Sequence, residues 1–538
     1  MKRFHLLFQT LDATRKTSVK ESALVEYFTD APAADSAWAA HILLGRKGRR
    51  TVNTRLLREW AAEISGHPLW LVEESYDAVG DLAETIALLV HTSPEPGEQD
   101  ERTEPPPLAQ FIEERVIGLS RLGDDEKKAL VLDTWRVTNQ GERFLFHKLI
   151  SGGFRVGVAK GLVARALSRV AGVDKPTMLH RLSGRWEPTA EAWQRLIAEE
   201  EEGADPLRPY PFFLAHPVPK EIGDLGPTVE YQAEWKWDGI RAQAVRRGGE
   251  LLLWSRGEDL VNTGFPEISE EFRALPAGTV LDGELLAWKD GAPMPFHSLQ
   301  RRIQRKSVSA KLRAEVPTRF VAYDLLEEQG EDLRSLTTTE RRSRLEALVS
   351  AAGLPHLGLA EIVPGTTWKA LAKVRESSRE RGVEGLMLKR LDATYGTGRQ
   401  RGAWWKWKVD PFTVDTVMIY AQRGHGRRAS LYTDYTLGVW DGDQLVPVAK
   451  AYSGLTDAEI RRVDNFVRRN ITDRFGPVRV VEPKLVFEIA FEGIQPSPRH
   501  KSGIALRFPR IARWREDKPP AEADTLGSLR QLLESTQG

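Results

Sequence analysis

The sequence EWKWDGIR, residues 234–241, places a lysine between two tryptophans and two positions before an Asp-Gly pair. Lys236 follows Glu234 by two positions, and Arg241 comes five positions after the lysine. Apolar segments flank the stretch, and an Asp-Gly pair favours a tight turn. The pattern therefore predicts a strand that ends in a turn. A lysine held at such a strand end can act as a nucleophile if neighbouring groups make it one.

The composition is that of an ordinary globular protein. The chain has 538 residues, of which 28% are charged and 41% hydrophobic, as in ordinary globular proteins. The formal net charge is +1, so a polyanionic partner would need locally clustered bases. The chain lacks cysteine, which excludes disulfides and cysteine nucleophiles and fits the cytoplasm. No stretch approaches the ~18 apolar residues of a membrane span, so no membrane contact is expected.

Residues 1–205 are predicted to form an all-helical domain. Apolar residues recur there at spacings of three and four, as in Leu82, Ile86 and Leu89, which is typical of amphipathic helices. A polar, proline-rich segment at residues 91–107 is predicted to be an exposed loop. An acidic run followed by proline-rich sequence marks the end of this domain near residue 205.

Glycines and basic residues lie together at residues 144–163, before a predicted helix. Backbone N–H groups at a helix N-terminus can bind phosphate, and Lys148, Arg155 and Lys160 would add positive charge. Two interpretations stay open: a phosphate-binding corner, and a helix–turn–helix corner whose bases are solvated. A second basic segment, residues 45–50, is more typical of a basic loop.

Two further domains are predicted. Strand-like and helical segments alternate over residues 206–410, which is an α+β pattern. Residues 411–538 are rich in short strands separated by Gly/Asp turns, with one helix near residues 457–469. About five strands with one helix are typical of a small oligonucleotide-binding (OB) barrel.

Five stretches of the middle domain carry charged or aromatic residues, several of them at predicted strand ends. They are residues 255–257, 282–284, 323–324, 384–389 and 405–408. Each stretch by itself is more typical of a turn or a solvated face. Their joint order after Lys236 is informative, because residues at strand ends can converge on one site.

A lysine needs neighbouring charge to become a nucleophile, because its reference pKa of ~10.4 keeps it protonated at neutral pH. Lys406 and Lys408 can supply that charge if they lie near Lys236. At ~4 Å and an effective dielectric of ~20, each unit charge contributes roughly 4 kcal/mol, or about three pKa units. The same two lysines can hold a phosphate whose charge grows during attack.

The other stretches supply groups that suit a nucleotide. The carboxylates of Glu284 and Glu384 can bind Mg²⁺ or a ribose hydroxyl, and Tyr323 can stack on a purine. Together these residues describe a site in which Lys236 attacks a nucleotide phosphate and carries the nucleotide covalently.

Residues 236–241 resemble motif I of the covalent nucleotidyltransferases, and the later stretches resemble motifs Ia, III, IIIa, IV and V in the same order. Residues 507–518, which include Arg515 and Lys518, resemble motif VI. The segment at residues 152–157 is similar to the helical DNA-binding domain of larger ATP-dependent DNA ligases. Over most of its length the chain therefore resembles a bacterial- or archaeal-type ATP-dependent DNA ligase.

This resemblance implies a multidomain α and α+β protein with a helical DNA-binding domain, an ATP-grasp-like adenylyltransferase domain and a C-terminal OB-fold barrel. It also implies ATP, with Mg²⁺ or Mn²⁺, and a reaction in three steps. Lys236 attacks the α-phosphate of ATP and expels pyrophosphate. The AMP then passes to the 5′-phosphate of a nick in duplex DNA, and the 3′-hydroxyl attacks and releases AMP. Nick sealing would serve replication, repair or recombination.

The motif match assigns roles to single residues. Contacts with ATP are implied for Glu234 (adenine), Tyr323 (base stacking), Arg241, Arg256 and Glu284 (sugar and adjoining groups), Lys406 and Lys408 (α-phosphate), and Arg515 and Lys518 (pyrophosphate). Glu384 would serve a metal ion, with Glu284 as the second carboxylate. The pyrophosphate contacts require the barrel domain to swing over the site in the first step.

DNA contacts are implied for five basic residues, which would bind phosphates without reading the bases. They are Lys148, Arg155, Lys160, Arg427 and Arg428. One departure concerns the segment before motif V, where Gln400 stands at the position that aligns with an arginine. Arg399 or Arg401 can replace it. Tyr323 also stands where phenylalanine is more frequent, which stacking tolerates.

Rival interpretations share the lysine chemistry. A capping-type guanylyltransferase would not need a helical domain of this size, and an RNA ligase usually lacks it. A non-catalytic nucleic-acid-binding scaffold would not need an intact Lys236, Glu384, Lys406 and Lys518. The preferred prediction is a monomeric ligase of the cytoplasm, associated with the nucleoid, that acts on nicked duplex DNA. A repair nuclease or a helicase is a possible partner.

Overall fold

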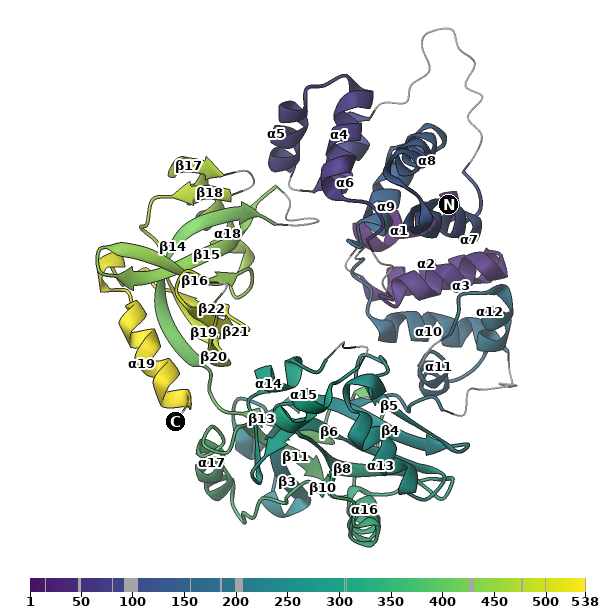
Figure 1. Cartoon of the computed structure of the whole chain (residues 1–538), viewed down its shortest axis with the longest axis vertical. Coiled ribbons are helices and arrows are strands. Elements are labelled where there is room, and N and C mark those ends of the chain that lie inside the picture. The colour runs from purple at the N-terminus through teal and green to yellow at the C-terminus, as the bar shows by residue number, and fades with distance from the viewer. Residues whose placement is uncertain are drawn as a thin grey trace. The chain divides into compact units, whose positions relative to one another are not determined.

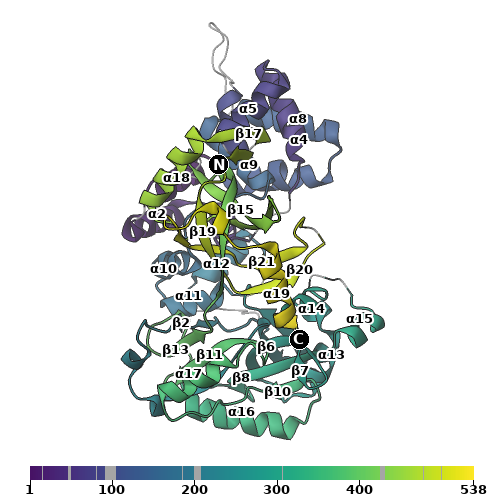
Figure 2. The ribbon, with the colours of Figure 1, turned by 90° about the vertical axis from the view of Figure 1, so that its left-hand side faces the viewer.

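The computed structural model describes residues 1–14, 16–46, 50–79, 81–90, 105–154, 156–183, 186–198, 207–303, 305, 307–424, 430–475, 478–498 and 500–537. The chain divides into two compact units, which are described separately. The first comprises Met1–Ala13, His41–Gly157 and Asp410–Gly538, and the second comprises Thr14–Ala40 and Val158–Val409. Figures 1 and 2 show their elements in two views.

The N-terminal region is helical, which confirms the prediction (Figure 1). The helices of the first unit are α1 (Lys2–Ala13), α4 (Thr54–Ser65), α5 (Leu69–Val79), α6 (Leu82–Leu89), α7 (Leu108–Phe111) with the π and 3₁₀ turns that continue it to Arg121, α8 (Asp124–Val137) and α9 (Gln140–Ile150). Those of the second unit are α2 (Thr17–Asp30), α10 (Lys160–Ala171), α11 (Lys175–Arg181) and α12 (Ala190–Ile197). Helix α3 (Ala33–Leu43) spans the division.

Local sequence explains where these helices begin. At the start of α9, the Asn139 side chain accepts a hydrogen bond from the Glu142 backbone N–H, and the Glu142 carboxylate accepts one from the Asn139 N–H. This reciprocal capping box satisfies two N–H groups that the helix itself cannot. The apolar face of α9 then buries Leu145, Phe146 and Ile150.

Residues 213–408 contain two main β-sheets. The seven-stranded sheet has the order β10-β8-β6-β4-β5, with β7 paired to β6 and β9 to β8, and the four-stranded sheet has the order β2-β13-β11-β3. Their longer strands are β3 (Tyr231–Trp237), β4 (Ile240–Arg247), β5 (Glu250–Ser255), β6 (Thr279–Lys289), β8 (Thr318–Glu328), β11 (Val383–Arg390) and β13 (Trp404–Lys408). The short strands are β1 (Phe213–Leu214), β2 (His216–Pro217), β7 (Ala292–Pro293), β9 (Glu331–Asp332), β10 (Leu357–Leu359) and β12 (Gly398–Arg399), and the helices are α13 (Pro266–Glu271), α14 (Phe296–Gln300), α15 (Ala310–Glu315), α16 (Thr338–Ala352) and α17 (Trp368–Glu376).

Alternation along β3 and β13 separates the functional face of the four-stranded sheet from its apolar face. Successive side chains of a strand point to opposite faces. Trp235 of β3 packs with Trp405 and Trp407 of β13 in one apolar cluster. Lys236 follows Trp235 on β3, and Lys406 stands between Trp405 and Trp407 on β13. Both lysines therefore lie on the face opposite the tryptophan cluster.

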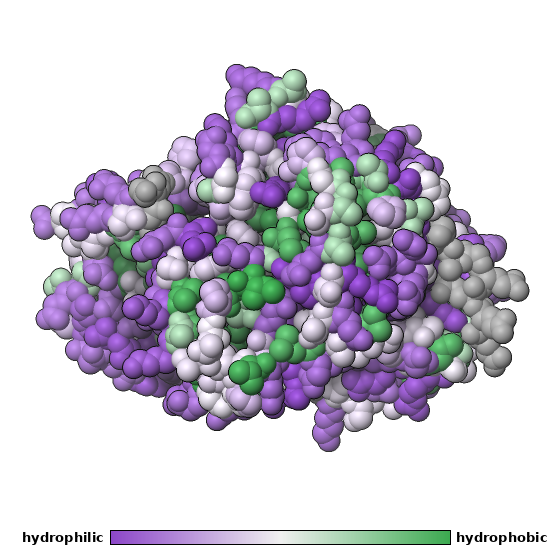
Figure 3. Space-filling view, turned by 90° about the horizontal axis from the view of Figure 1, so that it is seen from below, coloured by the Kyte–Doolittle hydropathy of each residue, from purple (hydrophilic) through white to green (hydrophobic). Residues whose placement is uncertain are grey.

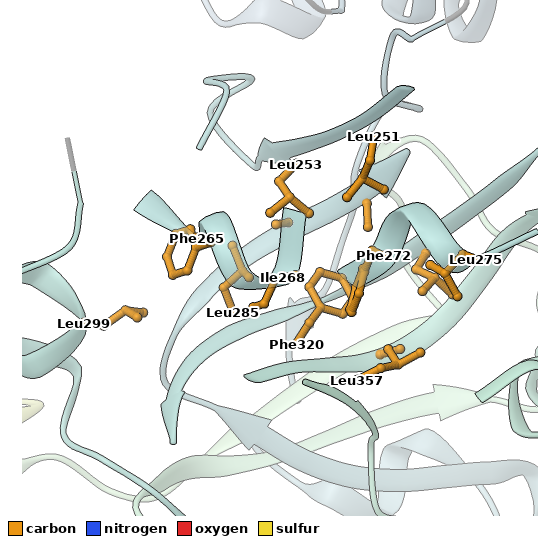
Figure 4. Close-up of a cluster of buried hydrophobic side chains, with 14 of the residues drawn as sticks. Leu251, Leu253, Phe265, Ile268, Phe272, Leu275, Leu285, Leu299, Phe320 and Leu357 are labelled. Carbon is orange, nitrogen blue, oxygen red and sulfur yellow. The ribbon is translucent and has the colours of Figure 1, made fainter. Parts of the chain in front are cut away.

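The seven-stranded sheet has a large apolar core of its own. Figure 4 shows Phe320 of β8 and Phe272 among the leucines of β5 and β6. The two phenylalanine rings meet edge to face with centroids 5.5 Å apart, an arrangement worth about 0.5–1.5 kcal/mol beyond the buried area. This core holds β4 and β6 firmly, and both strands carry predicted site residues.

The C-terminal part is β-rich, as predicted. Strand β14 pairs with β15, β18 and β19, while β16 pairs with β15, β17 with β18, and β22 with β19. The elements are β14 (Phe412–Arg423), β15 (Tyr432–Asp441), β16 (Gln444–Ala451), β17 (Ile471–Phe475), β18 (Val478–Val481), β19 (Val486–Phe491), β20 (Gly493–Pro496), β21 (Ile504–Arg507), β22 (Arg510–Trp514), α18 (Asp457–Arg469) and α19 (Leu526–Gln537). Helix α18 coincides with the helix expected at residues 457–469.

Polar side chains dominate the face of the molecule that Figure 3 shows. On the face in Figure 3, hydrophilic residues surround smaller hydrophobic patches. Among the described residues, no helix is both long and apolar enough to cross a membrane.

A close contact requires glycine where β11 meets β13. Gly385 has φ +137°, and a Cβ atom there would lie 2.2 Å from the Trp407 carbonyl oxygen. Gly402 also has positive φ, +107°, but a Cβ atom there would meet nothing within 4 Å. Comparing alanine at the two positions thus separates steric overlap from backbone strain.

We expect Gly385→Ala to lower the free energy of unfolding by about 1–3 kcal/mol more than Gly402→Ala, the usual cost of overpacking. Urea unfolding followed by tryptophan fluorescence measures both changes. If both variants lose the same free energy of unfolding, the need for glycine at position 385 comes from its positive φ alone and not from steric overlap.

Candidate active site

Lys236 lies near the end of β3, where the predicted strand-to-turn stretch is present. Strand β4 begins at Ile240, so Asp238 and Gly239 form the connection. A Cβ atom at Gly239 would lie 2.4 Å from the Leu285 carbonyl oxygen. Glycine is therefore needed where this turn passes β6.

Lys236 forms an ion pair with Glu384 of β11. Its Nζ lies 2.5 Å from Glu384 Oε2, and Lys408 Nζ lies 3.3 Å from the same oxygen. A register shift between Val383 and Leu386, where β11 pairs with β3, accompanies this placement. Burial raises the pKa of Glu384, but the two ammonium groups outweigh it and hold the pKa below its usual value.

Lys236, Lys406 and Lys408 lie near one another, and the Glu384 carboxylate pairs with Lys236 and Lys408. Burial lowers the pKa of Lys406, and the nearby Arg399, Lys408 and Lys236 lower it further. The position of Glu384 between Lys236 and Lys408 was not apparent from the sequence. No local signal near residue 384 could have revealed it, since it depends on how β11 pairs with β3 and β13.

Glu284 lies on β6 directly opposite Arg241 of β4. Burial raises its pKa to about 8, although Lys236 and Arg241 oppose that shift. Asp282 and Glu384 add to the increase through repulsion. The carboxyl group is therefore largely protonated at neutral pH, and an arriving cation would favour its ionised form.

The carboxylate of Glu234 is buried and already bound by neighbouring side chains. Lys389 of β11 contacts both oxygens, at 3.0 and 2.9 Å, and Gln232 donates to Oε1 at 2.6 Å. Arg342 Nη1 lies 3.8 Å from Oε1. Sequence reasoning missed these three partners. The spacing of Gln232 and Glu234 on one strand face was the only local hint.

Lys389 also connects Glu234 to Tyr323. It donates to the Tyr323 carbonyl oxygen at 2.8 Å, and its Nζ lies 4.7 Å from the centroid of the Tyr323 ring. The predicted base-reading glutamate and the predicted stacking tyrosine are therefore held beside each other.

Arg241 is largely occupied within the protein. Its Nε and Nη2 donate to the two oxygens of Asp282, at 3.1 and 2.7 Å, and Nη1 donates to the Phe213 carbonyl at 2.6 Å. Tyr395 donates to Asp282 at 2.6 Å. Burial opposes the charge of Arg241, but Asp282 more than compensates and raises its pKa. The contact between Arg241 and a sugar stays a prediction.

Arg256 and the two arginines before motif V differ in surroundings. Arg256 is exposed, and its backbone N–H donates to the Arg241 carbonyl at 3.0 Å. Arg399 is among the groups that lower the pKa of Lys406. Which of Arg399 and Arg401 replaces the arginine missing at Gln400 stays a prediction.

The residues predicted to bind DNA fall into two groups. Lys148 pairs with Asp81, which caps α6, and Lys160 pairs with Glu258 in the loop after β5. Both lysines thus have carboxylate partners inside the protein. Arg155, Arg427 and Arg428 lie outside the described residues, as do residues 47–49 of the second basic segment.

Arg515 and Lys518 lie in the C-terminal part and converge on one carboxylate. Arg515 Nη1 and Lys518 Nζ each lie 2.8 Å from Oδ2 of Asp415. Arg515 also forms a bidentate pair with Asp517. Sequence reasoning did not find Asp415, which lies about 100 positions earlier in the chain.

Three family models match the chain. Their descriptions are "DNA ligase N terminus" for residues 1–168, "ATP dependent DNA ligase domain" for residues 213–408 and "ATP dependent DNA ligase C terminal region" for residues 428–518. A probable DNA ligase of Koribacter versatilis is 31% identical over 98% of this chain and 96% of its own length. A DNA ligase of Thermococcus fumicolans is 28% identical over 98% of this chain and 97% of its own length.

A solved structure also shares the fold. The protein named Pmar-Lig_PreS3 matches with a TM-score of 0.63 and 16% identity, over 95% of this chain and 99% of its own length. At this identity the match concerns the fold alone.

Proposed function

The chain belongs to the ATP-dependent DNA ligase family, and from this premise we propose the roles of its residues in sealing nicks in duplex DNA. Members of this family act through a lysyl-AMP and then a DNA-adenylate intermediate. The observation that carries the residue assignment is the ion-paired cluster of Lys236, Glu384 and Lys408 at the start of the motif I turn.

Lys236 is the residue that carries AMP. Its nitrogen attacks the α-phosphorus of ATP, an N–P bond forms, and the bond to pyrophosphate breaks. The ammonium group must first lose a proton, and Glu384, whose Oε2 lies 2.5 Å from Nζ, holds the amine at the strand end where the attack takes place. A 5′-phosphate oxygen of the nick then takes AMP from Lys236, and the 3′-hydroxyl displaces AMP from the DNA.

The remaining residues bind and orient ATP. Lys406 and Lys408 hold the α-phosphate, whose negative charge they can stabilise as it grows. Glu234, fixed by Lys389 and Gln232, accepts a hydrogen bond from the adenine amino group, and Tyr323 stacks on the base. The sugar and adjoining groups are assigned to Arg241, Arg256 and Glu284, and pyrophosphate to Arg515 and Lys518.

Glu284 and Glu384 would hold Mg²⁺ or Mn²⁺. Carboxylate oxygens are ligands that these cations prefer, and Glu284 and Glu384 lie near enough for their negative charges to repel each other. No group of three or more His, Cys, Asp or Glu side chains that could hold a metal occurs in the described part of the chain. Phosphate oxygens and water would therefore complete the ligand set, as is usual for Mg²⁺. When bound, the ion supplies positive charge to the phosphates.

We assign residues 1–205 to a DNA-binding domain, 206–410 to an ATP-grasp-like adenylyltransferase domain and 411–538 to an OB-fold domain. The pairing of β14 with three other strands supports the last of these. Lys148 and Lys160 would bind DNA phosphates after releasing Asp81 and Glu258. The protein would act as a monomer, with a nuclease or a helicase as a possible partner.

A sealing assay with three nucleotides tests the assignment. A labelled nicked duplex should be sealed with ATP and Mg²⁺, and at least about 10²-fold less efficiently with GTP or NAD. GTP is disfavoured because guanine presents a carbonyl oxygen where adenine presents the amino group to Glu234. NAD carries adenine, but its leaving group is nicotinamide mononucleotide and not the pyrophosphate assigned to Arg515 and Lys518. Equal use of GTP would indicate a capping-type enzyme, sealing of RNA alone an RNA ligase, and binding without sealing a scaffold.

A further inference from the structure

Asp415 is a buried acidic residue on β14 whose side chain contacts two cations of motif VI. It is 8% exposed. Its Oδ2 accepts hydrogen bonds from Arg515 Nη1 and Lys518 Nζ, both at 2.8 Å. Its other oxygen, Oδ1, has no hydrogen-bond partner within the described residues. The hydrogen bonds that the Asp415 carboxylate accepts thus come from Arg515 and Lys518, which are called the motif VI pair below.

The backbone of Asp415 is itself fixed. Its N–H donates to Asp524 Oδ2 at 2.7 Å, and its carbonyl accepts from the Asp524 N–H at 2.9 Å. Asp415 also lies opposite Glu488 of β19 in the sheet. Asp415 is therefore held both by strand pairing and by the loop that contains Asp524, so its carboxylate has a fixed position for binding other side chains.

Of the two cations, Lys518 depends more on Asp415, because Arg515 also forms a bidentate pair with Asp517. Both are long side chains that lose much rotamer freedom when fixed. Because both nitrogen atoms contact one oxygen, they lie close together, and their like charges repel. The carboxylate overcomes this repulsion, and its hydrogen bond raises the pKa of Lys518. Two of the three N–H groups of Lys518 remain available for another acceptor.

We propose that Asp415 is a positioning residue for the first step of ligation, because it holds Arg515 and Lys518 as a preformed pair for the departing pyrophosphate. This inference rests on the function proposed above for those two residues. Since pyrophosphate leaves only in the first step, Asp415 should affect self-adenylylation and leave the last step unaffected.

The test uses Asp415→Asn, which keeps the size of the side chain and removes its charge. We expect the rate constant of self-adenylylation at saturating ATP to fall about 10- to 100-fold, as for a displaced catalytic group, with a smaller change in the KM for ATP. Sealing of a nick that already carries a 5′-adenylate, measured without ATP, should stay at the level of the unmodified protein.

Asp464→Asn is the matched control. Asp464 lies in the same C-terminal part, is 5% exposed, and accepts a hydrogen bond from Arg468 at 2.7 Å. It contacts neither Arg515 nor Lys518 in the described hydrogen bonds and ion pairs. This variant therefore reports the cost of removing the charge of a buried carboxylate in this part of the chain, and it should adenylylate at the normal rate.

Lys518→Ala distinguishes failure of this inference from failure of the proposed function. If Lys518→Ala adenylylates normally, the role assigned to motif VI is wrong. If Lys518→Ala is slow but Asp415→Asn is normal or faster, the positioning role of Asp415 is refuted. A loss of adenylylation and of the last step together would mean a purely structural role. The loss in the double variant should be smaller than the product of the two single losses, because Asp415 acts in part through Lys518.

Discussion

Replacing Lys236 with alanine is expected to abolish self-adenylylation. After incubation with α-labelled ATP and Mg²⁺, the unmodified protein should retain label through denaturing electrophoresis, and Lys236→Ala should retain none. The loss should be on the order of 10⁴–10⁶-fold, as for removal of a covalent nucleophile. In this variant Glu384 loses the amine 2.5 Å from its Oε2 and keeps Lys408, 3.3 Å from the same oxygen, whose proposed role is to hold the α-phosphate.

Lys369→Ala provides the control for this experiment. Lys369 is an exposed lysine on α17, in the same compact unit. Its replacement changes the charge by the same amount and should leave labelling normal. Label that survives on Lys236→Ala would refute the assignment of the AMP-carrying residue, whatever the sealing activity.

Deletion of residues 1–205 is expected to separate nucleotide chemistry from DNA binding. The apolar clusters that support the two middle sheets consist of residues from 210 onward. The truncated chain should therefore still form the lysyl-AMP. It would lose the helical phosphate contacts, and a protein that makes many such contacts loses affinity steeply with salt. Sealing at moderate salt should fall by on the order of 10²-fold or more.

Salt provides the control for the truncation. Sealing by the truncated chain should recover as the salt concentration is lowered, because weaker screening strengthens the remaining phosphate contacts. The deletion also removes His180, whose ring stacks on Tyr210 at 5.5 Å. Self-adenylylation at each salt concentration therefore has to be measured alongside sealing. Undiminished sealing at moderate salt would contradict the DNA-binding role of the helical region.

The sequence by itself determined the features that depend on the spacing of neighbouring residues: strand faces, helices and turns. Alternation in β3 and β13 separated the tryptophans from Lys236, Lys406 and Lys408. The helical spacing of apolar residues revealed the N-terminal region, and the turn residues revealed the strand-rich C-terminal part. The order of the motifs indicated the ligase family, which the family models and relatives confirm.

Tertiary structure decided which charged groups meet. Glu384 lies between Lys236 and Lys408 because β11 pairs with β3 and β13 around a register shift. Lys389 reaches Glu234 across the same sheet. Neither contact follows from spacing along the chain, since strand register between distant segments is fixed by the packing of whole sheets.

The same reason applies to the motif VI pair and to the DNA-binding lysines. Arg515 and Lys518 were recognisable from their motif, but Asp415 reaches them only because β14, β19 and β22 lie side by side. Likewise, the sequence marked Lys160 as a basic residue before a helix, and the fold gave it Glu258 as a partner. Sequence alone thus identified the reacting groups, whereas the fold determined which carboxylates hold them in place.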